Sequence, residues 1–160
     1  MIEPVVELDQ VSARPGSVVL ADVRSYLDGR SGRAAYDRGH RPGAIFVDLD
    51  HDLAEPASPA GGRHPLPDPA AFAERMASLG LSDHDTVIAY DDAGGVMAAR
   101  LVWMLRATGR DAALLNGGFA AYGGKLENAA PDRPRGSFAV RPWPAERLAA
   151  GRSSPTAVRA

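Results

Sequence analysis

The sequence predicts an α/β domain with a central, mostly parallel sheet of about five strands and helices on both faces. Short apolar runs bounded by turn residues recur along the chain, and segments with the apolar spacing of helices separate them. Alternation of strand and helix is typical of a parallel sheet. The 160 residues are enough for one domain, or one domain with a tail. The predicted strands are residues 18–21, 44–47, 86–90 and 112–115.

In the first half of the chain, residues 22–24 end the first strand and carry polar side chains to one edge of the sheet. Residues 32–38 are predicted to form a short helix that Gly39 ends. Residues 40–43, His-Arg-Pro-Gly, have the composition of a turn. Residues 55–69 are rich in proline and glycine, and we expect them to form an irregular surface loop.

The second half contains two clearer helices. Asp68 is a predicted N-cap with Pro69 at the first helical position, and Gly80 is the stop signal. Between them, Phe72, Met76 and Leu79 have helical spacing.

Residues 96–108 are the next predicted helix, with Trp103 and Met104 facing the core. After the last strand, a turn at residues 116–118 should lead into a short helix through Tyr122.

Composition excludes several classes of function. The net charge is −2 and the acidic and basic residues are interspersed, so neither nucleic acid nor an anionic membrane surface is an expected partner. No apolar run approaches the roughly 18 residues of a membrane span, and no signal peptide follows Met1, so we expect a cytoplasmic protein. The sequence contains no cysteine, which excludes disulfides, thiolate zinc sites and thiol catalysis.

The loop after the predicted strand 86–90 is the strongest candidate site. It lies between a strand end and a helix N-terminus, where backbone N–H groups hold anions. Its topology also places Asp22, Asp91 and Asn116 near one another, because ligands of such sheets lie beyond the carboxyl ends of the strands. The loop consists of Asp91, Asp92, Ala93, Gly94, Gly95 and Val96.

Six segments in this order resemble the rhodanese superfamily, and specifically the first domain of tandem-domain thiosulfate or 3-mercaptopyruvate sulfurtransferases. The resemblance covers about residues 5–124. The segments are LADVR (20–24), YDRGHRPGAIFVDLD (36–50), GRHPLP (62–67), VIAYDD (87–92), AARLVWMLRATG (98–109) and LLNGG (114–118).

The resemblance implies that the catalytic cysteine belongs to a second domain and that Asp91 occupies its position here. The family's loop stabilises a thiolate and then a persulfide, which requires a low thiol pKa. A carboxylate there would satisfy the backbone N–H groups by itself and repel an incoming anion. This chain alone should therefore not transfer sulfur, and no cofactor or metal is implied.

The implied partner is a cysteine-containing rhodanese domain, and this chain would form part of the wall of its active-site pocket. The candidates for that wall are His40, Arg41, Arg63 and His64, together with Asp91 and Asp92. The Asp91–Val96 loop is expected to be slightly longer than active loops, so that its N–H groups converge poorly and Asp91→Cys alone restores little activity. Taken by themselves, His40 is expected to bond backbone within its turn, and Asp22 with Arg24 to form a structural pair.

The expected domain organisation is a rhodanese-like domain over residues 1–124 and a linker over 125–143. Residues 144–160 are expected to be the start of an incomplete second domain or a disordered tail. A stand-alone pseudo-enzyme that binds or regulates partner proteins is the alternative function.

Four aspartates suggest a more remote alternative function, and they are Asp48, Asp50, Asp91 and Asp92. The first two resemble the opening motif of magnesium-dependent haloacid-dehalogenase-type phosphatases, and the others would be the later metal-binding acids. That family places a lysine before the final acidic pair, whereas Lys125 follows it.

Two further resemblances are weaker. Dual-specificity phosphatases of the cell-cycle type share the fold and its loop, but the cysteine is missing here and Arg100 lies too far into the helix. Two acidic clusters lack the spacing of a known metal-binding loop, and we interpret them as solvated surface. The clusters are Asp48, Asp50, His51 and Asp52, and Asp83, His84 and Asp85.

Overall fold

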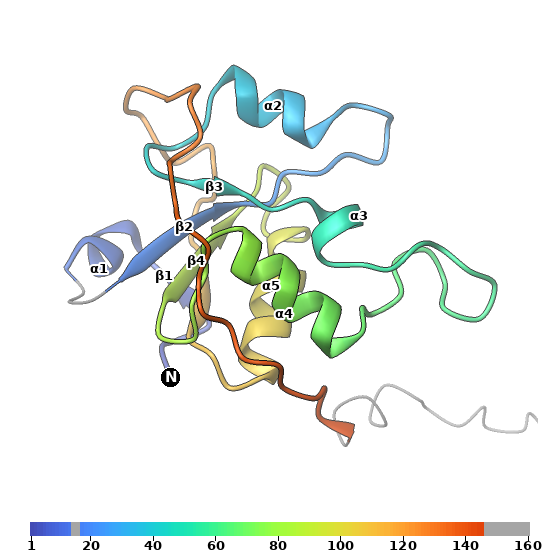
Figure 1. Ribbon diagram of the computed structural model, residues 1–160. Helices are drawn as coiled ribbons and strands as arrows, with labels where there is room; N and C mark the ends of the chain where they lie inside the picture. Colours follow the sequence, from blue (N-terminus) through green and yellow to red (C-terminus); the bar gives the residue numbers. More distant parts are fainter. Residues whose placement is uncertain (14–16, 146–160) are drawn as a thin grey trace, which may run out of the picture.

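Five parallel strands form a single sheet in the order β1-β5-β4-β2-β3. This computed structural model describes residues 1–13 and 17–145 (Figure 1). The expected strands are present, which confirms the predicted fold class. Sequence reasoning missed β1, because a two-residue edge strand is too short to show a pattern. The strands are β1 (Val5–Val6), β2 (Val18–Asp22), β3 (Ile45–Phe46), β4 (Thr86–Tyr90) and β5 (Ala112–Leu115).

Alternating side chains of the sheet feed two separate hydrophobic clusters. Val19 and Ala89 pack with α4 and α5 on one face. Ile88 and Tyr90 pack on the other face, with α1 and the N-terminal segment. Successive side chains of a strand point to opposite faces, so apolar runs of this kind require cover on both sides. The helices are α1 (Leu8–Ser12), α2 (Gly32–Arg38), α3 (Leu49–Asp52), α4 (Pro69–Ser78) and α5 (Ala98–Ala107).

Local signals placed α2 and α4 correctly. The predicted bounds of α2 agree with the structure, and its Ser31 side chain accepts a hydrogen bond from the Ala34 N–H. The Asp68 carboxylate caps α4 by accepting from two backbone N–H groups, and Pro69 is its first residue.

Three sequence expectations need correction. The predicted short helix through Tyr122 is absent, because the turn at residues 116–118, with φ angles of 77° and 57° at Gly117 and Gly118, continues as turns through residue 121. Helix α5 begins at Ala98 rather than at residue 96, because residues 94–97 form a turn, and the Ala98 N–H donates to the Asp91 carboxylate. Trp103 is 37% exposed and is not a core residue, although Met104 is fully buried.

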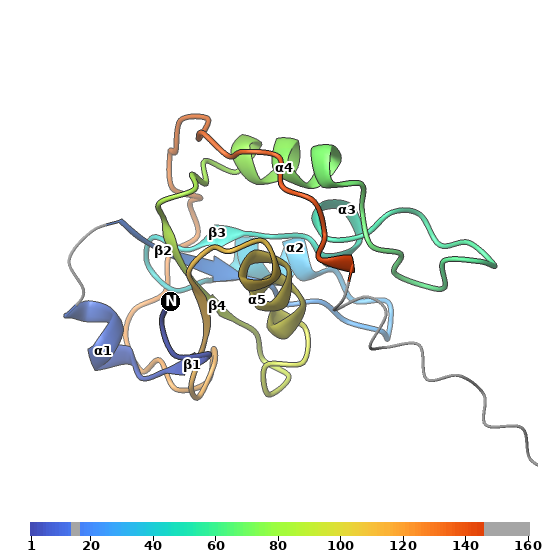
Figure 2. The same cartoon turned by 90° about the horizontal axis from the view of Figure 1, so that it is seen from below.

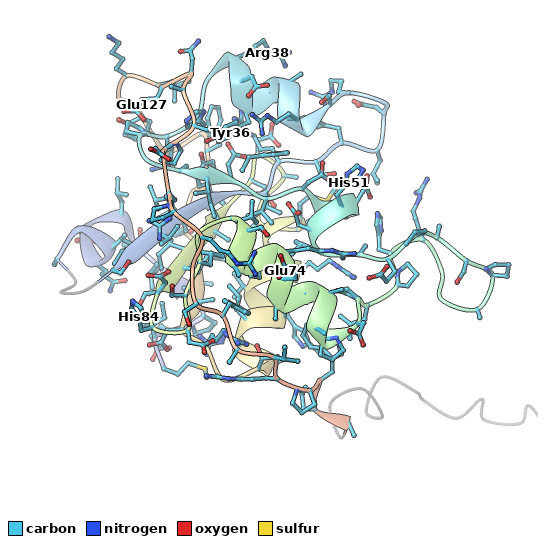
Figure 3. All side chains as sticks on the ribbon, viewed as in Figure 1. Tyr36, Arg38, His51, Glu74, His84 and Glu127 are labelled. Carbon is cyan, nitrogen blue, oxygen red and sulfur yellow. The ribbon has the colours of Figure 1, made fainter. Side chains whose placement is uncertain are left out.

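Residues 125–143 are extended: Glu127 pairs with His40 after the end of α2, and the later part of the segment runs along α4 (Figure 2). Phe138 and Trp143 contact Phe72 of α4 through their rings. Arg135 forms an ion pair with Glu74, which is labelled in Figure 3. The segment expected to be a linker therefore covers part of the core. The boundaries at 124 and 143 stay predictions, and residues 146–160 of the expected second-domain start lie outside the described residues.

Within the described part of the chain, no helix is both long and apolar enough to cross a lipid bilayer.

Candidate functional site

The Asp91 carboxylate lies at the carboxyl end of β4 and is 1% exposed. One oxygen accepts hydrogen bonds from the N–H groups of Ala93 and Gly95, at 2.9 and 2.8 Å. The other accepts from Met97 and Ala98, at 2.8 and 2.9 Å. Four backbone donors thus converge on one side chain at the start of α5, where the helix dipole also favours negative charge.

This geometry corrects one expectation. The N–H groups of the loop were expected to converge poorly, yet four of them converge on the side chain of residue 91. Gly94 and Gly95 make the loop possible, with φ angles of 71° and 91° that other residues rarely adopt. From the neighbouring turn, Phe119 donates its N–H to the Asp91 carbonyl oxygen at 2.9 Å, and a Cβ at Gly118 would lie 2.6 Å from that oxygen.

Asp22 and Arg24 form a buried ion pair behind the loop. The Arg24 guanidinium donates to both carboxylate oxygens of Asp22 and to the Gly39 carbonyl oxygen. Tyr90 donates its hydroxyl hydrogen to the same carboxylate at 2.9 Å. Burial lowers the pKa of Arg24, but the bonded carboxylate outweighs it and the pKa lies above its ordinary value. Burial is also the main cause that raises the pKa of Tyr90. The predicted structural pair is confirmed.

His40 and Arg41 lie inside the domain, at 0% and 2% exposure. Both ring nitrogens of His40 face backbone carbonyl oxygens, those of Tyr36 and Ala129, at 2.9 and 3.1 Å. Its partners therefore extend beyond its own turn, to residue 129. Side chains this deeply buried present no surface for a second domain to contact.

Arg41 is a buried cation with no carboxylate partner among the described residues. Its guanidinium lies over the rings of Tyr90 and Tyr122 and donates to the Gly118 carbonyl oxygen, while its Nε has no acceptor. Burial lowers its pKa. These contacts attach the 116–122 turn to the sheet, so the role of Arg41 in this chain is structural.

Arg63 and His64 lie on the surface, beside the loop that follows β2. His64 Nε2 lies 2.9 Å from an Asp50 carboxylate oxygen. Both residues line a cavity of about 290 Å³ with Tyr26 and Met97. Among the described residues, Arg63 has no hydrogen-bond or ion-pair partner. Of the four wall candidates outside the Asp91 loop, we therefore retain Arg63 and His64.

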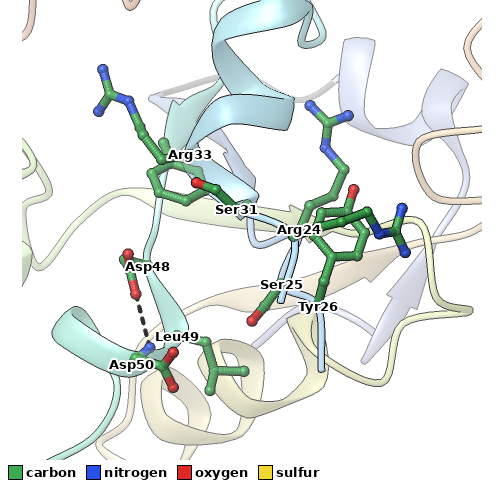
Figure 4. A pocket seen from close by; sticks show the side chains of 11 residues that line it. Arg24, Ser25, Tyr26, Ser31, Arg33, Asp48, Leu49 and Asp50 are labelled. Atoms are coloured by element: carbon green, nitrogen blue, oxygen red, sulfur yellow. Dashed lines mark hydrogen bonds between the residues drawn. The ribbon is translucent and has the colours of Figure 1, made fainter. Parts of the chain in front are cut away.

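A second, polar cavity of about 180 Å³ adjoins this one, because Ser25, Tyr26, Leu49 and Asp50 line both. Figure 4 shows this second cavity from close by. Tyr26 donates its hydroxyl hydrogen to Asp92 at 2.7 Å, which ties the loop after β2 to the loop after β4. Sequence reasoning missed Tyr26 and the Asp50–His64 contact, because neither has a local signal.

The topology argument is confirmed, because Asp22 pairs with Tyr90 beside Asp91, and Asn116 follows β5, which pairs with β4. Asp91 and Asn116 line one cavity of about 390 Å³, together with Asp92 and the glycines of both loops. Asp22 does not line it, because its carboxylate is fully buried beneath Arg24 and Tyr90.

The acidic clusters have local roles. The Asp48 carboxylate caps α3 by accepting from the N–H groups of Asp50 and His51. The Asp52 carboxylate accepts from the Asp48 N–H. Within residues 1–13 and 17–145, no three His, Asp or Glu side chains form a group that could hold a metal ion. The Asp91 carboxylate, which the phosphatase alternative assigns to metal binding, is taken up by four backbone N–H groups instead.

The model of the rhodanese-like domain matches residues 6–125. The chain belongs to this family. This rhodanese domain is 44% identical over 120 residues to a probable 3-mercaptopyruvate sulfurtransferase of Pseudomonas aeruginosa, covering 71% of this chain and 42% of that protein. It is 39% identical over 114 residues to a putative thiosulfate sulfurtransferase of Mycobacterium tuberculosis, covering 69% of this chain and 40% of that protein.

Solved structures agree. The rhodanese domain matches a 3-mercaptopyruvate sulfurtransferase of Leishmania major with a TM-score of 0.74 and 32% identity, over 88% of this chain and 40% of that one. It matches SseA of Escherichia coli with a TM-score of 0.75 and 31% identity, over 88% of this chain and 58% of that one. The chain thus spans about two fifths of the curated relatives it matches, and it is a sulfurtransferase-related rhodanese domain without cysteine.

Proposed function

We propose that this chain is the non-catalytic rhodanese half of a thiosulfate or 3-mercaptopyruvate sulfurtransferase. Its partner would be a cysteine-containing rhodanese domain, in the same polypeptide or supplied separately. The observation that carries the proposal is that the Asp91 carboxylate occupies the anion-binding loop after β4. Four N–H donors of the kind that stabilise a thiolate are bound to the Asp91 carboxylate, and the chain has no thiol.

The occupied loop would exclude the sulfur donor from this half. Thiosulfate and 3-mercaptopyruvate are anions, and the Asp91 charge repels an anion while its two oxygens take the four donors. In the partner domain, a thiolate would attack the donor's transferable sulfur, forming a persulfide and releasing the rest of the donor. An acceptor such as cyanide would then take that sulfur and regenerate the thiolate.

Arg63 and His64 would contribute the wall of that pocket. Arg63 is exposed, cationic and free of a partner among the described residues, so it remains able to attract an anionic donor. His64 is held by Asp50, which fixes its ring at the edge of the cavity. These side chains bind and orient; neither is a nucleophile for sulfur transfer.

Asp91→Cys tests the proposal. Because four N–H groups already converge on this position, we expect a thiol pKa below the ordinary value of about 8.5. Thiocyanate production should nevertheless stay far below that of two-domain sulfurtransferases, because the second wall of the pocket is absent. The measurements are the pH dependence of thiol alkylation and the rate of thiocyanate formation from thiosulfate and cyanide.

Asp92→Cys is the matched control, since Asp92 is exposed and its carboxylate accepts only the Tyr26 hydroxyl hydrogen among the described residues. Its thiol should alkylate like a free cysteine. Sulfur transfer by Asp91→Cys at the rate of a two-domain enzyme would show that a single domain suffices, and the proposal would then be wrong.

A further inference from the structure

The turn after β5 carries an asparagine followed by a glycine on the surface of the protein. Asn116 and Gly117 are both exposed. The Gly118 N–H donates to the Leu115 carbonyl oxygen at 3.1 Å and closes the turn. Gly117 has a φ angle of 77°, a value that favours glycine at this position of a turn. The turn therefore holds an Asn-Gly pair in contact with solvent, at the cavity of about 390 Å³ that both residues line.

The side-chain amide of Asn116 lies beside the backbone nitrogen of the next residue. The Gly117 nitrogen is 3.1 Å from Oδ1 of Asn116, and the amide carbon is bonded to that oxygen. Because residue 117 has no side chain, it does not shield the amide carbon from its own nitrogen or from solvent. The Nδ2 group of Asn116 donates to Oε1 of Glu7 at 2.6 Å and is exposed. An electrophilic carbon, a nitrogen nucleophile and water thus meet at one exposed point.

We propose that Asn116 is a site of spontaneous deamidation, with water as the co-reactant. The Gly117 nitrogen gives its proton to solvent and attacks the amide carbon of Asn116. The new N–C bond closes a succinimide ring, and the bond from that carbon to Nδ2 breaks, so that ammonia leaves with a proton taken from solvent. Water then opens the ring at either carbonyl group and leaves aspartate or isoaspartate. Asparagine is among the thermolabile residues of proteins.

Asn128 is an internal control, because it is the other of the two asparagines in the sequence. It is also exposed, but Ala129 follows it, and the methyl group of an alanine crowds the attack. Its neighbours are held in place, since Glu127 pairs with His40 through the backbone and the Ala129 carbonyl oxygen faces the His40 ring. We expect Asn128 to stay intact while Asn116 reacts.

Deamidation would remove a hydrogen bond between the β5 turn and the N-terminal segment. Glu7 lies between β1 and α1 and is the N-cap of that helix. A carboxylate at residue 116 would face Glu7 where the amide now donates at 2.6 Å, and two like charges this close disfavour each other. Isoaspartate also adds a carbon to the backbone of the turn, whose Phe119 N–H binds the Asp91 carbonyl oxygen. The product should therefore have a lower Tm than the original chain.

Peptide mapping of the full 160-residue chain by mass spectrometry, after incubation at pH 7 and at pH 9, tests the site. Trypsin separates the two asparagines, since cleavage after Arg110 and Lys125 leaves Asn116 in one peptide and Asn128 in the next. We expect the mass of the Asn116 peptide alone to rise, because NH2 is replaced by OH. The rise should be faster at pH 9, because the attacking nitrogen must lose its proton.

An Asn116 peptide whose mass rises no faster than that of the Asn128 peptide would overturn the proposal. A rise confined to the chain unfolded in urea would also overturn it, since the fold would then protect Asn116. Mass is the readout because Asp28, which precedes Gly29, forms isoaspartate without a change in mass. Asn116→Gln keeps the amide on a longer side chain and should stay unmodified.

Thermal unfolding of Asn116→Asp, which carries the aspartate product at this position, tests the consequence. Its Tm should fall, and it should fall less in a Glu7→Gln background, where an amide at residue 7 donates to the new carboxylate. Asn128→Asp is the matched control and should leave Tm unchanged. Equal losses in the two backgrounds would overturn the assigned repulsion by Glu7.

Discussion

Asp91 holds the loop after β4 in place through four hydrogen bonds from backbone N–H groups. The carboxylate is at once the N-terminal cap of α5 and the ligand of its own loop. Under the proposed function the same geometry would exclude anions, because the donors that would bind a free anion are already engaged.

Asp91→Ala should lower the free energy of unfolding by about 2–3 kcal/mol, because it leaves buried N–H donors without an acceptor. Formate at high concentration should restore part of the loss by occupying the vacated place. Urea unfolding with and without formate measures both effects. The neighbouring variant Asp92→Ala should change stability by less than about 0.5 kcal/mol and show no formate effect.

Arg24 and Arg41 are both buried arginines, but their partners differ. Arg24 neutralises the buried Asp22 carboxylate, whereas Arg41 has two aromatic rings and one carbonyl oxygen. Arg24→Met should therefore lower stability by about 3–5 kcal/mol, because it leaves Asp22 buried and uncompensated. Arg41→Met should cost less, about 1–2 kcal/mol, because it removes one hydrogen bond and two ring contacts but leaves no buried charge without a partner.

Thermal unfolding of the two variants tests this contrast. A loss at Arg41→Met as large as that at Arg24→Met would show that the rings of Tyr90 and Tyr122 stabilise Arg41 as strongly as a carboxylate does.

At the scale of elements, the segment 125–143 covers part of the core of the domain, with Phe138 and Trp143 partly buried against it. Trp143 donates its indole N–H to the Pro67 carbonyl oxygen at 2.7 Å and packs against Phe72 and Trp103. Gly136 lies so close to the Leu81 carbonyl oxygen that a Cβ would be 1.9 Å from it. Only glycine permits this approach of the two backbones.

Trp143→Ala should lower the free energy of unfolding by about 2 kcal/mol, because it uncovers Phe72 and leaves the Pro67 carbonyl oxygen without its donor. Val140→Ala, in the same segment, is the control, since Val140 is 61% exposed and should lose less than about 0.5 kcal/mol. Urea unfolding monitored by circular dichroism compares them. Equal midpoints for both variants would show that the segment adds nothing to stability.

For the whole molecule, Asp83 connects three parts of the chain. Its carboxylate bonds Arg110 and the Ala139 N–H, and Arg141 lies 3.7 Å away. Burial raises the pKa of Asp83, but the Arg110 hydrogen bond, the Ala139 N–H and the two positive charges outweigh it, so the pKa lies below its ordinary value. Such a group stabilises the fold above its unfolded pKa, and this contribution disappears as pH falls through its folded pKa.

Asp83→Asn should therefore lower stability at pH 7, and its effect should shrink as pH falls below the unfolded pKa of about 3.9 toward the lower folded pKa. Urea unfolding midpoints between pH 2.5 and pH 7 give the two curves, which should converge as pH falls. Curves that stay parallel over this range would contradict the prediction. In an Arg110→Met background the difference at pH 7 should shrink, because the main partner of the carboxylate is gone.

Sequence reasoning placed the elements whose signals are local. Asp68 and Pro69 start α4, and Gly39 ends α2, because caps and stops act within one turn of chain. It failed for the 116–122 turn and for Trp103, where distant residues decide. Arg41 and Asp91 hold the turn, and Trp143 covers part of Trp103.

The candidate site divides in the same way. The order of strand, acidic glycine loop and helix, and the absence of cysteine, were determined by the sequence alone, since both depend on residue type and spacing. Only the tertiary structure decided that four N–H groups converge on Asp91, that His40 and Arg41 are buried, and that Tyr26 meets Asp92. These depend on the distance between residues far apart in the chain, which the parallel packing of β2 and β4 sets and no local pattern encodes.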